Sequence, residues 1–180
     1  KEILVLTKAN SRATVHRPSY LDYVGVKRFD EAGEVAGERR FLGLYTSTAY
    51  SARPDEIPLL RRKIRKVRER SGMPPGSHAD KALVEILETY PRDELFQISD
   101  DDLFETALGI LELGERQRVR LFVRRDRFGR FFSCLVYVPR DRFNTQVREA
   151  IQELLREVFG GTSVDWNIRL SESVLARLEA

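Results

Sequence analysis

One strand constrains the fold of this 180-residue chain more than any other segment. Over Arg130–Val138, RFFSCLVYV, apolar side chains occupy nearly every position after the first. Successive side chains of a strand point to opposite faces of its sheet, so an apolar run of this kind must be covered on both faces. Proline has no N–H to donate to a sheet, and Pro139 therefore ends the strand. The chain is predicted to contain a central strand buried from both sides.

The residues around this strand predict an α/β module. RVRLFVRRD alternates apolar and basic side chains, and Asp126–Gly129 forms the turn into the central strand. Asn144 suits a helix N-cap, and the helix that follows carries one apolar stripe and ends at Gly160–Gly161. SVDWNIRL predicts a half-buried strand over 163–170. With a helix from Asp101, the order is helix, strand, strand, helix, strand, which is the ferredoxin-like order without its first strand.

The first 50 residues predict β-structure. EILVLT is a short apolar run, and Tyr20–Phe29 and Glu38–Thr46 are rich in valine, phenylalanine and tyrosine. DEAGEVAGE lies between these two runs, with Gly33 and Gly37 as expected turn residues. An antiparallel hairpin is therefore predicted.

Residues 54–113 predict helices. Ile57, Leu60, Ile64 and Val67 recur at helical spacing, and SGMPPGS ends that helix as a linker. A second helix is predicted over Lys81–Glu88, started by Asp80 and stopped by Tyr90–Pro91, and PRDELFQIS predicts a short helical turn. Ser99 and the aspartates after it open a third helix, which Gly114 ends.

Charge is distributed in blocks along the chain. Arg53–Gly72 holds eight Lys/Arg and three Asp/Glu, Asp80–Glu115 holds two and eleven, and Gly114–Arg142 holds nine and three. The net charge is only +3. A free polyanion-binding surface would carry one dominant sign, so these blocks are expected to neutralise each other, within the chain or between neighbouring chains.

The sequence offers little for catalysis or metal binding. Two histidines, His16 and His78, lie in different segments, and the single cysteine, Cys134, lies inside the central strand. A zinc site needs several such ligands together, and a nucleophile needs an adjacent base. Neither glycine-rich phosphate-binding pattern occurs. No catalytic, metal or cofactor-binding residues are therefore predicted.

The same features bound the cellular setting. One cysteine cannot form an internal disulfide, which favours a reducing compartment. The sequence contains no apolar run long enough to span a membrane and no signal-peptide pattern at its start. We expect a cytoplasmic protein without membrane partners.

RNA binding is the alternative that the arginines and aromatics raise. RFGRFFSCLVYV loosely resembles the basic, glycine and aromatic strand of RNA-recognition modules, which share the ferredoxin-like order. Such a module needs aromatics at alternate positions on an open face. Here Phe131 and Tyr137 share one face and Phe132 lies on the other, among aliphatic residues. A covered scaffold strand is favoured, and an RNA-recognition-like module stays the alternative.

Several long blocks resemble one family. ETYPRDELFQ, CLVYVPRDRFNT, SGMPPGSHADKALVEILETY and SVDWNIRLSESVLARL are similar to the large bacterial NAD-specific glutamate dehydrogenases, and the resemblance covers nearly the whole chain. It implies a slice of the N-terminal half, which carries ACT-like and PAS-like domains with helical connectors. Residues 1–52 would be a β-rich, PAS-like part, 53–114 a helical connector, and 115–180 an ACT-like module with its C-terminal strand expected to be truncated. The implied fold class is α+β: an antiparallel β-hairpin segment, a helical connector and a ferredoxin-like (ACT-like) α/β sandwich.

The resemblance also implies a role. The parent enzyme converts L-glutamate, NAD and water to 2-oxoglutarate, ammonium and NADH, but none of the family's catalytic or NAD-binding motifs occurs in these residues. We therefore expect a non-catalytic regulatory and assembly segment, with other domains of the same chain and homo-oligomer partners as its contacts. ACT modules often bind small amino acids, so an effector site is a second hypothesis. Its candidate residues lie in two loops near strand ends and a helix start: Arg125, Asp126, Gly129, Arg140 and Asn144.

Overall fold

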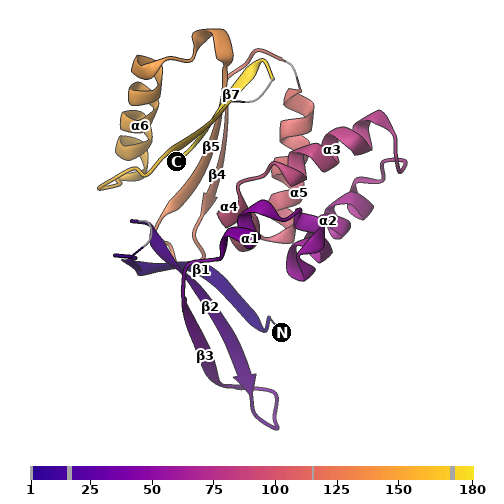
Figure 1. The fold of residues 1–180 in the computed structure, drawn as a ribbon, viewed down its shortest axis with the longest axis vertical. Coiled ribbons are helices and arrows are strands. Elements are labelled where there is room, and N and C mark those ends of the chain that lie inside the picture. The colour runs from indigo at the N-terminus through magenta and orange to yellow at the C-terminus, as the bar shows by residue number, and fades with distance from the viewer. Residues whose placement is uncertain (1, 16–17, 115, 171–172) are drawn as a thin grey trace. The chain divides into compact units, whose positions relative to one another are not determined.

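The computed structural model describes residues 2–15, 18–114, 116–170 and 173–180. The chain forms two compact units: Lys1–Ile64 with Arg92–Gln97, and Arg65–Pro91 with Ile98–Ala180. Two antiparallel sheets, with helices between them in the sequence, give an α+β protein (Figure 1), which confirms the predicted fold class.

The first unit contains a three-stranded antiparallel sheet. Its strands β1 (Leu4–Arg12), β2 (Tyr20–Phe29) and β3 (Val35–Gly43) follow each other in that order. The predicted hairpin is confirmed, but β3 begins and ends three residues earlier than Glu38–Thr46. Gly37 lies inside β3, paired with Arg28, so its prediction as a turn residue is wrong. Of these two glycines, only Gly33 has the positive φ, 78°, of a turn glycine.

A partly buried ion network fixes a later helix on this sheet. The Lys8 ammonium on β1 donates to Asp22 at 2.6 Å and to Asp93 at 3.0 Å. Asp22 also accepts from the Tyr45 backbone N–H at 2.8 Å, and Asp93 from the Tyr50 hydroxyl at 2.7 Å. Because Asp93 lies in the short helix α4 (Arg92–Gln97), these bonds join α4 to the sheet. Short α1 (Ser47–Ser51) and η1 (Pro54–Glu56) complete the unit.

The predicted helices of residues 54–113 form. They are α2 (Pro58–Ser71), α3 (His78–Glu88), α4 and α5 (Asp100–Leu113). Ser77 and Ser99 cap α3 and α5 by accepting from the N–H groups of Asp80 and Asp102 at 3.1 and 3.0 Å. Gly114 ends α5.

The basic helix α2 is neutralised by the acidic block that follows it. Arg68 donates two hydrogen bonds to Asp80, at 3.0 and 2.9 Å, across the Gly72–Ser77 linker. Lys66 pairs with Asp100 at 2.6 Å and Arg70 with Asp101 at 2.5 Å. The expected neutralisation is therefore confirmed between the first basic block and the acidic block, whereas for the basic block Gly114–Arg142 it stays a prediction.

The second unit contains a four-stranded antiparallel sheet. Its elements are β4 (Arg120–Arg125), β5 (Phe132–Pro139), η2 (Arg140–Arg142), α6 (Thr145–Phe159), β6 (Asn167–Leu170) and β7 (Leu175–Glu179). The strand order is β4-β5-β7-β6. The sequence analysis found no strand after residue 170, so β7 corrects it. β7 lies in the interior of the sheet, where the first strand of a ferredoxin-like fold would lie.

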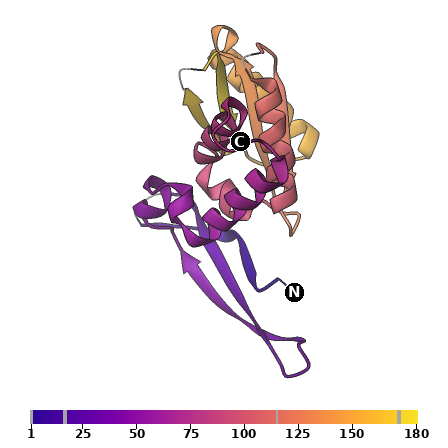
Figure 2. The same cartoon turned by 90° about the vertical axis from the view of Figure 1, so that its right-hand side faces the viewer.

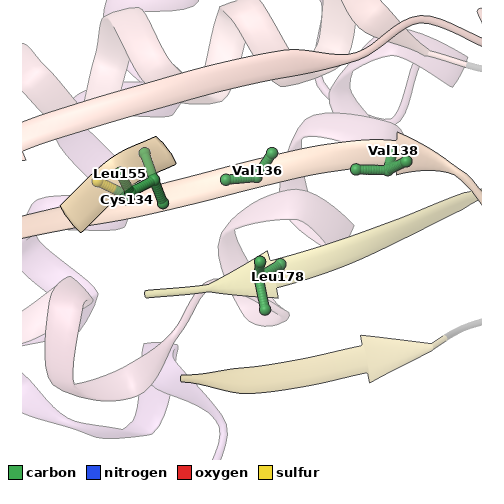
Figure 3. Packing of buried hydrophobic residues seen from close by; sticks show 5 residues of the cluster. All are labelled: Cys134, Val136, Val138, Leu155 and Leu178. Carbon is green, nitrogen blue, oxygen red and sulfur yellow. The ribbon is translucent and has the colours of Figure 1, made fainter. Parts of the chain in front are cut away.

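Helix α6 covers one face of this sheet. Leu155 of α6 packs with Cys134, Val136 and Val138 of β5 and with Leu178 of β7 (Figure 3). Partly buried hydrophobic residues surround this cluster: Phe132, Phe143, Val147, Ile151, Phe159, Ile168 and Ala180. Cys134 is buried, forms no disulfide and packs as a small hydrophobe.

Helices α3 and α5 lie on the other face (Figures 1 and 2). The Phe122 ring of β4 approaches α5 so closely that a Cβ on Gly109 would lie 2.7 Å from it. Phe122 pairs with Leu135, whose side chain points away from the α6 cluster. The predicted two-sided burial of the central strand is confirmed. Helix α5 therefore lies on the opposite face of the sheet from α6.

Asp80 should make the stability of the helices depend on pH. The Arg68 guanidinium, and then the Gly76 N–H, hold the pKa of the Asp80 carboxyl below its usual range. A lowered folded-state pKa gives stability above the unfolded pKa of about 4, which is lost as the pH falls through the folded value. Asp80→Asn should therefore flatten the decline in stability between about pH 5 and pH 2.

Urea titrations at several pH values, followed by the fluorescence of the single tryptophan, Trp166, measure this. Glu105→Gln, at an exposed position of α5, is the matched control and should keep the wild-type slope. Equal pH slopes in wild type and Asp80→Asn would contradict the assignment.

Candidate functional site

Asp126 builds the turn between β4 and β5. Its side chain is buried and accepts from the backbone N–H of Phe128 at 3.1 Å and of Arg130 at 3.4 Å. The Arg130 Nε donates to the same oxygen at 3.0 Å. A carboxylate oxygen with these three donors holds the hairpin closed.

Gly129 and Arg125 complete the same turn. Gly129 has φ +68°, and its N–H donates to the Asp126 carbonyl at 2.8 Å. A Cβ at this position would lie 2.9 Å from the Arg125 Nη2, so the guanidinium of Arg125 lies over the glycine. The positive φ favours glycine at this position.

The second candidate loop follows β5 at its other end. The Arg140 N–H donates to the Val174 carbonyl at 2.8 Å, which joins the loop to the start of β7. The Asn144 side chain accepts from the Val147 N–H at 2.9 Å and caps α6, as predicted. Asn144 thus stabilises a helix start in the absence of any ligand.

The two candidate loops lie far apart. The hairpin turn precedes the eight-residue strand β5 and the Arg140–Asn144 loop follows it, which separates them by about 25 Å. The structure brings Arg125, Asp126 and Gly129 together, and Arg140 near Asn144. It does not bring the two groups into one small-molecule site within a chain. Effector binding at either loop stays a prediction.

A polar cluster that was not predicted from the sequence lies on the α3 side of the sheet. Arg177, on the interior strand β7, is buried and donates to Glu179 at 2.6 and 3.0 Å. It also donates to the Thr89 carbonyl at the end of α3, at 2.9 Å, and Arg169 donates to the same oxygen at 3.3 Å. Two cations at a helix C-terminus stabilise its dipole. Burial raises the pKa of the neighbouring Tyr137 hydroxyl.

This cluster joins α3 to the sheet and is not arranged for proton transfer. Thr89 precedes Tyr90–Pro91, the helix stop that the sequence does reveal. The buried arginine was missed because β7 has no alternation of apolar and polar residues to mark it as a strand.

The described residues give no metal or membrane site. They contain no group of three or more histidine, cysteine, aspartate or glutamate side chains placed to hold an ion. Among the same residues, no helix is long and apolar enough to cross a membrane. His78 is the first residue of α3, whereas His16 lies outside the described residues.

Removing the Asp126 carboxylate should open the hairpin turn. Asp126→Ala leaves two N–H groups and a guanidinium without their acceptor, and should lower the free energy of unfolding by about 2–3 kcal/mol. Denaturant titration monitored by Trp166 measures the loss. Asp141→Ala, at an exposed position of η2, is the control and should change stability by less than about 0.5 kcal/mol. Equal effects of the two substitutions would contradict the role of Asp126.

Two family models match the chain. Residues 57–116 match helical motif 1 of glutamate dehydrogenase, and residues 120–180 match the ACT2 domain of glutamate dehydrogenase. The first match contains α2 to α5, and the second contains the four-stranded sheet with α6. The boundary between the two matches lies after α5, so α3 and α5 belong to the first match and the sheet that they cover belongs to the second.

Curated relatives agree with these matches. NAD-specific glutamate dehydrogenases of Halomonas elongata, Pseudomonas aeruginosa and Mycobacterium tuberculosis are 51%, 44% and 36% identical over 178, 177 and 172 residues. These alignments cover 99%, 98% and 96% of this chain, but only 11%, 11% and 10% of the relatives. The chain is thus similar over nearly its whole length to NAD-specific glutamate dehydrogenases, and it spans about a tenth of the length of the relatives that it matches.

Proposed function

We propose that these residues form a non-catalytic regulatory and assembly segment of an NAD-dependent glutamate dehydrogenase. The parent enzyme would oxidise L-glutamate with NAD and water to 2-oxoglutarate, ammonium and NADH in the cytoplasm, with NAD bound outside this segment. The observation that carries the proposal is the pair of matches, to a helical motif and an ACT2 domain, over residues 57–116 and 120–180. Its partners would be other domains of the same chain and other copies of the enzyme.

The packing of the aromatics supports a scaffold role over RNA binding. Phe132 stacks on Phe159 of α6 with ring centroids 4.4 Å apart, and Phe122 meets Tyr137 edge to face at 5.9 Å. An RNA-recognition sheet needs aromatic faces open to stack on bases. These four rings already pack against each other, so they cannot provide such a platform without disrupting the unit.

A deletion experiment tests the assembly role. The purified 180-residue chain should form no NADH from glutamate and NAD, while the full-length gene product should. Removing residues 120–180 from the full-length protein should change its mass in solution, as measured by light scattering, because the ACT2 domain would no longer contribute contacts. An unchanged oligomer with unchanged turnover would contradict the proposal, as would NADH formation by the 180-residue chain.

Amino-acid binding tests the regulatory part. If a small amino acid binds at one of the candidate loops, calorimetry of the chain with each amino acid should detect it. Arg140→Ala and Arg125→Ala are a matched pair, because they remove one cation from each loop. Only the variant of the occupied loop should weaken binding, by about tenfold for one lost charge-assisted hydrogen bond. The absence of heat and of a thermal shift with every amino acid would contradict effector binding.

A further inference from the structure

Helix α6 carries a second apolar stripe that does not face its own core. Ile151 and Leu155 point into the cluster with β5 and β7. Leu154 and Val158, four residues apart on the neighbouring flank, are 58% and 66% exposed. Residues four apart lie above one another on a helix, so these two side chains form a continuous ridge.

The edge strand β4 has a matching uncovered surface. Leu121 and Val123 pair with Val136 and Cys134, so they lie on the α6 face of the sheet. Yet Leu121 is 41% and Val123 44% exposed, whereas their partners are buried. Leu121, Val123, Leu154 and Val158 are called the open face below.

The orientation of α6 places its exposed ridge on the β4 side. Arg148 lies over the Trp166 ring at 4.2 Å, and Trp166 immediately precedes the opposite edge strand β6. At about 100° per residue, Val158 and Leu154 lie about 80° and 120° around the helix from Arg148, on the far side of the core-facing Ile151. The ridge of α6 and the exposed residues of β4 therefore border one surface.

This surface has the width of one helix. Strands lie about 4.8 Å apart and a helix with side chains is about 10 Å wide, so a four-stranded sheet needs two helices to cover one face. Among the described residues, α6 alone packs on this face. Its core contacts come from β5, β7 and the edge strand β6, which leaves β4 uncovered.

We propose that the open face binds an amphipathic helix of the same polypeptide from outside residues 1–180. The relatives are far longer than this chain, which spans 11% of two of them, and a tethered helix has a high effective concentration. Arg125 shares the β4 parity of Leu121 and Val123, so an acidic flank on that helix would be favoured. A second copy paired through β4 would instead place its arginines against each other.

Thiol protection tests this proposal. In Leu154→Cys the new thiol lies on the open face, and the native Cys134 is buried, which keeps background labelling low. The thiol should react rapidly in the 180-residue chain. In the full-length gene product it should react at least about tenfold more slowly, for an opening equilibrium of about 1.4 kcal/mol or more. Gln146→Cys, exposed on a different flank of α6, should react equally fast in both.

Three results would overturn the proposal. Leu154→Cys would label equally fast in both proteins if no helix covers the face. Protection that disappears when the full-length protein is diluted into monomers would identify a second copy as the occupant. Protection already present in the 180-residue chain would mean that the face is covered by the chain itself or its dimer. Val158→Cys repeats the test if Leu154→Cys does not fold, and none of these readouts depends on the activity under test above.

Discussion

The requirement to bury strand β5 on both faces governs the second unit. An eight-residue strand with Cys134, Leu135, Val136 and Val138 buried needs a layer on each side of its sheet. Helix α6 supplies one layer. Helices α3 and α5 supply the other, joined to the sheet by the Arg177–Thr89 hydrogen bond and by the contact between Phe122 and Gly109. Helices that the family models assign to a separate motif therefore complete the core of the ACT-like module.

The buried guanidinium of Arg177, which faces the layer of α3 and α5, makes the packing of that layer specific rather than adding hydrophobic stabilisation. Arg177 loses much of its hydration when β7 enters the sheet, and Glu179 and a helix-end carbonyl replace that hydration. An apolar residue would pack against any helix. A guanidinium requires an acceptor at one place, which selects the end of α3 and so sets how the helix lies on the sheet.

Local chemistry made much of this structure predictable. The caps at Ser99 and Asn144, the stop at Tyr90–Pro91 and the valine- and aromatic-rich run Tyr20–Phe29 are signals that act within a few residues, and the structure has them where expected. β7 was missed because Leu175, Ala176, Arg177 and Leu178 are all buried, which removes the alternation on which strand prediction depends. The face of the sheet that α5 covers could not be predicted, because sequence order does not say on which side of a sheet a helix packs. The candidate loops could be found as turns, but the distance between them depends on the length of β5.

The position of α4 means that the two units cannot be separated by a single cut. Residues 92–97 fold with the first sheet, whereas the residues on both sides of them belong to the second unit. The chain therefore passes between units three times, once within the continuous helix α2. A protein that stopped before α4 would leave Lys8 and Tyr50 without Asp93, while one that began after it would lose α3 and the carbonyl that Arg177 needs. During synthesis, α4 can pack on the first sheet only after most of the helical motif has been made.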